Sequence, residues 1–288
     1  MADVAMKPVD PVRALSRREL RRLDLAYQPG FKPVAWFCIL LLYAPILVLA
    51  VFSFNENRSV TRWTQFSLKW FRDVIANENI QAAALLSLQV ATAATIGATI
   101  CATLAALATT RTLPYRGMGL AYIVINLPLM VPEIVTAVAT LAFFALGRVV
   151  LGLDLGVFNI NLILAHMVFC IPFAYLPIRA RLSGMDRILE QAAADLYATP
   201  WQSFRYVTLP LLTPGIIAGA MLAFIVSIDD FTISQLVAGP GQTTLPIYIW
   251  GQIRRGITPA TNAVSTIMLV VSIIFVSLVF FLGQRRRR

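Results

Sequence analysis

The chain has 288 residues, of which 58% are hydrophobic and 13% are charged, and its formal net charge is +10. Soluble domains carry about 25% charged residues, so this composition, with a mean hydropathy of +0.75, excludes an ordinary soluble protein. The cysteines Cys38, Cys101 and Cys170 all fall within apolar runs. Three scattered cysteines and one histidine predict neither disulfides nor a metal site.

Residues 1–33 precede the first apolar run and are expected to form a separate N-terminal segment. Ser16 and Glu19 have the spacing of a helix capping box. Leu20, Leu23 and Tyr27 then recur on one face among arginines. This pattern is typical of an amphipathic helix on an anionic membrane surface, and the alternative is a basic tail that only sets topology. The first apolar run lies too far from the N-terminus for a secretory signal peptide, and none is expected.

Six later runs are each long enough to span a membrane as a helix, which needs roughly 20 apolar residues. Backbone groups in lipid must be satisfied internally, and no run alternates with the period of two that a membrane β-barrel requires. The sequence therefore predicts an all-α polytopic membrane protein with a permease domain at 34–282 and a basic tail at 283–288. The expected spans are Val34–Phe54, Ala82–Thr109, Met118–Leu146, Ile160–Ala180, Pro214–Val237 and Thr261–Leu282.

An even number of spans places both termini on one side, and the distribution of basic residues indicates which side. Seventeen Lys and Arg residues fall in the segments on the side of the termini and seven on the other side. Because Lys and Arg are enriched in cytoplasmic loops, both termini and the segment 183–210 are predicted to be cytoplasmic. The same rule accounts for the net positive charge without a nucleic acid partner.

The second span is rich in Ala, Thr and Gly between Ala91 and Ala108. Small residues allow helices to approach closely in lipid. We therefore expect this helix to be central and tightly packed, and not to face lipid.

Three acidic residues lie within the apolar runs, where ionisable groups are costly and usually functional. Glu133 follows Pro128 and Pro132 near the middle of the third run, and Asp229 and Asp230 lie toward the outer half of the fifth. An acid beside a broken helix is a common way to build a transport site. Glu133, Asp229 and Asp230 are therefore candidates for a cation pathway, with helix capping or an interhelical hydrogen bond as the alternative.

Aromatic residues follow a turn signal, Gly239-Pro-Gly241, after the fifth run. Tyr248 and Trp250 are typical of an interfacial aromatic belt, and contact with the transported solute is the other role open to them. His166 stands alone on an apolar helix, where a packed and hydrogen-bonded histidine is expected.

The polar stretch from Gln191 to Pro210 reads QAAADLYATPWQSFRYVTLP. It resembles the coupling motif of the permease subunits of bacterial ABC importers: E-A-A, three residues, glycine, nine residues and I-x-L-P. The nine-residue gap is intact. The resemblance implies that this segment docks on a partner ATPase, through Gln191, Ala192, Ala193, Asp195, Tyr197, Ala198, Leu209 and Pro210.

Two residues depart from this motif. Gln191 stands at the glutamate position, with Glu190 as its neighbour, and Tyr197 stands at the glycine position. Glycine suits a turn between two helices because it tolerates a positive φ. Either the turn has changed shape, or the protein accepts backbone strain of roughly 1–2 kcal/mol at Tyr197.

Other motifs resemble the polyamine group of these permeases, specifically the second permease subunit of spermidine/putrescine importers. They are Leu42-Tyr-Ala-Pro45, Ser53-Phe-Asn55, Met185-Asp-Arg187, Ser227-Ile-Asp-Asp-Phe231, Gly239-Pro-Gly241, Thr243-Thr-Leu-Pro246 and Ile253-Arg-Arg-Gly-Ile-Thr-Pro259. The resemblance implies an inner-membrane permease that does no chemistry and pairs with a second permease, two cytoplasmic ATPases and an extracytoplasmic binding protein. ATP and Mg²⁺ would bind the ATPases, since this chain lacks the G-x-x-x-x-G-K-[ST] motif.

Three alternatives remain: an importer of another small solute, a secondary transporter that works alone, and a membrane-embedded enzyme. A lone transporter explains the intramembrane acids but not the polar segment that ends in Leu209-Pro210. An enzyme would need a nucleophile–base pair or a metal cluster, and the sequence suggests neither.

Overall fold

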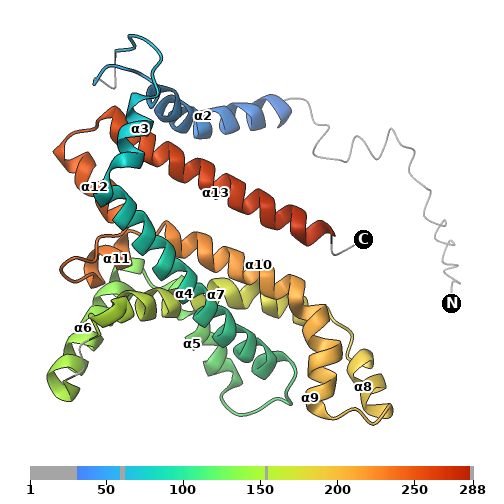
Figure 1. Cartoon of the computed structure of the whole chain (residues 1–288). Coiled ribbons are helices and arrows are strands. Elements are labelled where there is room, and N and C mark those ends of the chain that lie inside the picture. Colours follow the sequence, from blue (N-terminus) through green and yellow to red (C-terminus); the bar gives the residue numbers. More distant parts are fainter. Residues whose placement is uncertain (1–30, 59–61, 153–154, 286–288) are drawn as a thin grey trace, which may run out of the picture. The chain divides into compact units, whose positions relative to one another are not determined.

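The computed structural model describes residues 31–58, 62–152 and 155–285, with side chains up to Ser277. The chain divides into two units at the Phe52–Ser53 boundary. In the described part of the first unit, α2 (Phe31–Phe52) is a 22-residue apolar helix with Pro45 inside it (Figure 1). This helix confirms the first expected span. The amphipathic helix expected near Ser16–Tyr27 lies outside the described residues.

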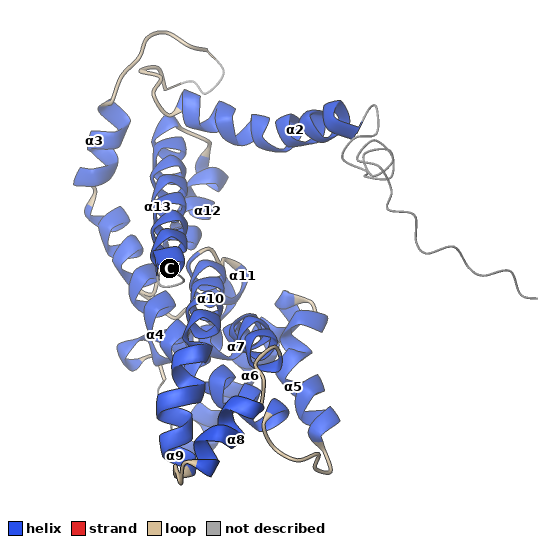
Figure 2. Cartoon of the chain, turned by 90° about the vertical axis from the view of Figure 1, so that its right-hand side faces the viewer, coloured by secondary structure: helices blue, strands red, loops and turns tan. Residues whose placement is uncertain are grey.

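The described part of the second unit consists of helices and loops, with only an isolated bridge between Asn55 and Phe66 (Figure 2). Among the residues that the structure describes in the two units, six helices are long and apolar enough to cross a membrane. The helices of the second unit are α3 (Lys69–Ala76), α4 (Glu78–Thr110), α5 (Met118–Met130), α6 (Glu133–Leu151), α7 (Ile160–Ser183), α8 (Ile188–Asp195), α9 (Pro200–Ser203), α10 (Leu209–Ile228), α11 (Thr232–Val237), α12 (Leu245–Arg255) and α13 (Pro259–Arg285), with a 3-10 turn at Val157–Asn159 and a π turn at Phe204–Thr208.

Helices α4, α7 and α10 pack against one another and form the core of the second unit (Figure 1). Along α4 the fully buried residues Ala94, Ala98, Ala102 and Ala106 recur every four positions, so one face of the helix consists of small side chains. On α10, a Cβ atom at Gly219 would lie 2.6 Å from the carbonyl oxygen of Ala174 on α7. The two backbones therefore meet at a position that has no room for a side chain. The expectation that the second span is central is confirmed.

The third expected span, Met118–Leu146, is two helices in the structure. Val131 has extended backbone angles between α5 and α6, as expected for a residue that precedes proline. Pro132 lacks the N–H that a continuous helix would use. Glu133 is therefore the first residue of α6 and does not lie in the middle of a continuous helix.

The fifth expected span, Pro214–Val237, differs at both ends. It begins earlier, because the helical chain continues from Pro200 through the π turn into α10. It also ends earlier, because α10 stops at Ile228 and a separate helix α11 starts at Thr232. The apolar run concealed both changes, since hydrophobicity alone does not report where backbone hydrogen bonding is interrupted.

A second, smaller core joins α3 to α13. Trp70 and Val74 of α3 pack with Ala263 and Val264 of α13. The Trp70 indole N–H donates to the carbonyl oxygen of Asn55 at 2.8 Å, which ties α3 to the preceding loop.

Candidate coupling segment and polar cluster

The segment 183–210 folds as two short helices joined by a tight turn. The coupling motif predicts a short helix over Ala192–Ala198, but the structure places the helix earlier, as α8 at Ile188–Asp195. The N–H of Ala198 donates to the carbonyl of Ala193 at 3.0 Å, and that of Tyr197 to Ala194 at 2.9 Å. These two bonds form a Schellman motif, which ends a helix with a left-handed residue.

Tyr197 is that left-handed residue, with a φ of 60°. The turn has therefore kept the backbone shape that glycine would favour, and the tyrosine adopts it at a cost of roughly 1–2 kcal/mol. The Tyr197 residue is 95% exposed, so the ring makes no packing contact that offsets the strain within this chain. Of the two possibilities left by the sequence, the structure supports strain and not a rebuilt turn.

The second helix of the pair, α9, begins with a complete capping box. The Thr199 side chain accepts from the backbone N–H of Gln202, and the Gln202 side chain accepts from the N–H of Thr199. Pro200 occupies the first helical position, where its missing N–H costs nothing. Sequence reasoning missed this signal, although the Thr-Pro-x-Gln spacing is sufficient to predict it.

The segment 183–210 has large apolar side chains at its surface, in the turn, in α9 and in the π turn that follows. Leu196 is 82% exposed, Trp201 69% and Tyr206 74%. Gln191, Ala192 and Asp195 are also exposed, whereas Ala193 and Ala198 are half-buried. Leu209 and Pro210 are the first two residues of α10, so the end of the motif belongs to the next long helix. An exposed apolar surface of this kind marks an interaction site.

A second group of polar residues meets where α10 ends. We call Glu133, His166, Ser227, Asp230 and Ser234 the acid–histidine cluster. The His166 ring lies 2.8 Å from the Ser227 hydroxyl through Nδ1 and 3.0 Å from the Ser234 hydroxyl through Nε2. Its Nε2 is also 3.4 Å from Oδ2 of Asp230. His166 is thus the packed, hydrogen-bonded histidine that the sequence predicted, and it joins α7 to both sides of the break.

Asp230 is buried and caps α11. Its carboxylate accepts the backbone N–H of Ile233 at 3.2 Å and that of Ser234 at 2.9 Å. These bonds satisfy donors at a helix start that have no partner within the helix. The capping role that the sequence left open is therefore present, and a role in transport stays a prediction.

Glu133, at the start of α6, interacts with the side chains of Asp230 and Thr232. It is half-buried, whereas Asp229 is exposed and Asp230 is buried. The structure thus brings Glu133 and Asp230 together from positions far apart in the sequence. Because Asp230 is buried and both of its oxygens accept backbone N–H groups, Glu133 is the more accessible acid of the pair.

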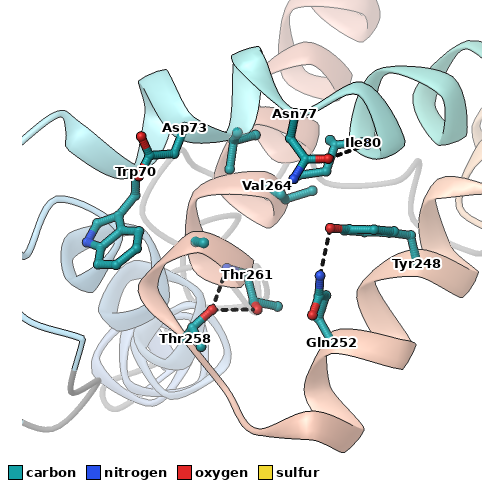
Figure 3. Close-up of a pocket in the computed structure, with 11 residues that line it drawn as sticks. Trp70, Asp73, Asn77, Ile80, Tyr248, Gln252, Thr258, Thr261 and Val264 are labelled. Carbon is teal, nitrogen blue, oxygen red and sulfur yellow. Dashed lines mark hydrogen bonds between the residues drawn. The ribbon is translucent and has the colours of Figure 1, made fainter.

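The two aromatic candidates lie at different places. Trp250 packs against Phe231 next to the break in the helix, with ring centroids 5.2 Å apart and the ring planes tilted by 45°. Tyr248 lines a separate cavity of about 150 Å³ (Figure 3). There its hydroxyl accepts from the Gln252 amide at 2.6 Å. The same cavity is lined by Asp73, an acid that sequence reasoning did not single out.

The loop after α11 is held by a pair of buried amides that sequence reasoning also missed. Asn161 donates to Gln242 Oε1 at 2.8 Å, and Gln242 donates back to Asn161 Oδ1 at 3.0 Å. Gln242 Oε1 also accepts the N–H of Gly239. The Gly239–Gly241 turn is therefore fixed against the start of α7.

The long apolar helices, with a short exposed helix pair between α7 and α10, define a multi-pass membrane protein. The family model described as "Binding-protein-dependent transport system inner membrane component" matches residues 98–288. The chain belongs to this family and is a multi-pass permease.

Two similar proteins are permeases named for polyamine transport. The putrescine transport system permease protein PotI of Escherichia coli K12 is 37% identical over 79% of this chain and 81% of its own length. The spermidine/putrescine transport system permease protein PotC of the same strain is 36% identical over 82% of this chain and 86% of its own length.

Solved structures support the fold. A subunit of a bacterial ABC transporter that imports the acidic polysaccharide alginate has a TM-score of 0.72 at 17% identity, covering 93% of this chain and 98% of that one. A chain of the MetNI methionine ABC transporter has a TM-score of 0.56 at 21% identity, covering 73% of this chain and 96% of that one. At these identities the likeness concerns the fold alone.

Proposed function

We propose that this permease carries polyamines, such as putrescine or spermidine, in an ATP-driven importer. The observation that carries the proposal is the 37% identity, over about four-fifths of the chain, to a permease named for putrescine transport. The acids support it, because a polyamine has two or more positive charges and needs negative partners in a medium of low dielectric constant. Glu133 and Asp229 are the accessible acids at the break. Asp230 caps α11 and lies beside Glu133, so its charge acts at the same site.

The proposed assembly contains a second permease, two ATPases and an extracytoplasmic binding protein, and the ATPases bind ATP and Mg²⁺. Both termini and the segment 183–210 lie in the cytoplasm, in accordance with the distribution of Lys and Arg. The exposed face of α8 and α9 docks on an ATPase. Closure of the ATPase dimer draws the coupling segments together and turns the pathway from inward to outward facing.

The test is reconstitution of the permease with its partner chains in lipid vesicles. We expect labelled putrescine or spermidine to accumulate only when ATP and the binding protein are both present. Thermal stabilisation of the binding protein by a panel of solutes gives the substrate independently. If a different solute stabilises the binding protein and is taken up, the importer assignment holds and the polyamine assignment fails.

A secondary transporter remains the competing function. An ionophore that collapses the ion gradient distinguishes the two, because it would abolish gradient-driven uptake and leave ATP-driven uptake unchanged. Uptake without any ATPase present would contradict the proposal.

A further inference from the structure

The side of α8 that faces the rest of the chain makes polar contacts, whereas its opposite side is the exposed docking face. Glu190 is 25% exposed at its side chain and faces Arg111, which is 13% exposed and follows directly after α4. The Arg111 Nε lies 3.1 Å from Glu190 Oε1. Its N–H is not aligned as a hydrogen bond, so the contact is an ion pair.

The same carboxylate oxygen has a second partner. The hydroxyl of Thr208, which is buried at the end of the π turn, donates to Glu190 Oε1 at 3.0 Å. Thr208 directly precedes α10. One side chain of α8 therefore contacts residues at the ends of two core helices.

Two arginines link the end of α4 to the residues just before α8, one from each side. Arg111 donates through Nη2 to the carbonyl of Met185 at 3.2 Å. Arg187, just before α8, donates through Nη2 to the carbonyl of Thr110 at 2.5 Å. A guanidinium on a free carbonyl at a helix C-terminus is favourable, both as a hydrogen bond and toward the helix dipole.

The packing of α8 gives these contacts their importance. The α8 backbone packs against α9 and the π turn, so the described links to α4 run through long polar side chains. In turn, α4 packs along α7 and α10 in the core. A displacement of α8 can therefore reach α4 through Arg111 and Arg187, and α10 through Thr208.

We propose that Glu190 is a positioning residue for coupling: its carboxylate, shared by Arg111 and Thr208, transmits the movement of α8 to α4 and α10 together. The proposal rests on the proposed function, because it assumes that an ATPase moves α8. It assigns a role to Glu190, whose side chain points toward α4 and α10. The next residue, Gln191, is exposed on the docking face. A glutamate at 190 is needed because only an anion can pair with Arg111 while it accepts from Thr208.

The experiment uses the full reconstituted complex and measures solute taken up per ATP hydrolysed, together with the Tm of the complex. Glu190→Gln keeps the size of the side chain and an acceptor for Thr208 but removes the charge. We expect this ratio to fall at least ~5-fold in Glu190→Gln and in Arg111→Ala, with ATP hydrolysis retained. The matched control is Arg116→Ala, an exposed arginine in the same loop, which should keep the wild-type ratio.

A charge exchange separates coupling from a merely structural role. The double variant Glu190→Arg with Arg111→Glu should recover the ratio to within about twofold, because the ion pair is restored with its signs reversed. An unchanged ratio in Glu190→Gln at normal Tm overturns the proposal. Equal losses of uptake and ATP hydrolysis with a lowered Tm, and no recovery in the exchange variant, also overturn it. If Arg111→Ala fails to assemble, the near-isosteric Glu190→Gln decides alone.

Failure of the proposed function would look different. A wild-type complex without ATP-driven uptake of any polyamine would refute the substrate assignment. The effect of Glu190 can still be read from ATP hydrolysis stimulated by the binding protein, whatever solute that protein carries.

Discussion

Two of the interruptions between helices are built differently: the turn between α8 and α9, and the break between α10 and α11. The first is built from contiguous residues, since its Schellman bonds and capping box join atoms at most five positions apart. The second brings together Glu133, His166 and Asp230 from three separate helical regions. A local turn can be altered without unfolding the bundle, whereas a turn made by distant side chains is coupled to the packing of the core. The proposed roles agree with this difference, because the coupling segment has to move as a unit and the break has to keep its shape within the membrane.

The largest expected effect concerns the acids at the break. Glu133→Gln together with Asp230→Asn should lower polyamine uptake about 10-fold or more, because charge-assisted contacts are worth roughly 1.5–3 kcal/mol each. Glu133→Gln alone should cause most of the loss. Asparagine is a good N-cap residue and keeps one of the two oxygens that accept N–H groups at the start of α11, so α11 should persist in the Asp230 variant. Labelled-putrescine uptake in vesicles measures the effect, and basal ATP hydrolysis is the control. Full uptake by the double variant would remove these acids from the pathway and weaken the polyamine assignment.

At the coupling segment we expect a similar effect by a different route. Ala192 is exposed on α8, so Ala192→Arg should separate the docked surfaces and lower stimulated ATP hydrolysis about 10-fold, as for the loss of a central interface contact. Ala193 is half-buried within the permease, so Ala193→Arg would confuse docking with folding. Ala192→Ser is the matched control. Normal stimulation in Ala192→Arg would show that this face does not dock.

The stability of the break should depend on His166. His166→Ala leaves the Ser227 and Ser234 hydroxyls without their buried partner, and an unsatisfied buried group costs about 2 kcal/mol. We expect a lower Tm of the permease in detergent. Val168→Ala, an exposed position on the same helix, provides the comparison. An unchanged Tm in His166→Ala would mean that the cluster does not hold α7 to α10 and α11.

The smallest effect is expected at Tyr197 and has the opposite sign. Tyr197→Gly should raise stability by about 1 kcal/mol, because glycine adopts the left-handed conformation without a Cβ penalty. Tyr197→Asn should give a smaller gain, since asparagine tolerates this conformation better than most residues. The Tm of the permease measures both. A loss of stability in Tyr197→Gly would show that the aromatic ring supports the turn.

Much of this protein follows from the sequence by itself. Long apolar runs require helices in lipid whatever their neighbours do, so the all-α class and the approximate spans were predictable. The small residues of the second span predicted a central helix, and α4 confirms it. The spacing of the coupling motif located a segment whose turn is made by local backbone bonds.

Only the tertiary structure decided where the spans break and which polar groups meet. Pro132 ends a helix by local chemistry, yet the position of Glu133 beside Asp230 depends on how α6 packs against α11. The sequence marked Asp230 as an acid within an apolar run but could not distinguish a helix cap from a pathway residue. The N–H groups that bond to its carboxylate lack helical partners only because α10 ends and α11 starts anew. Likewise, the sequence showed Glu190 only as a neighbour of the coupling motif, whereas the structure pairs it with Arg111 at the end of α4. Hydrophobic pattern and local turns are properties of contiguous residues, whereas these ion pairs and hydrogen bonds exist only after distant helices have packed.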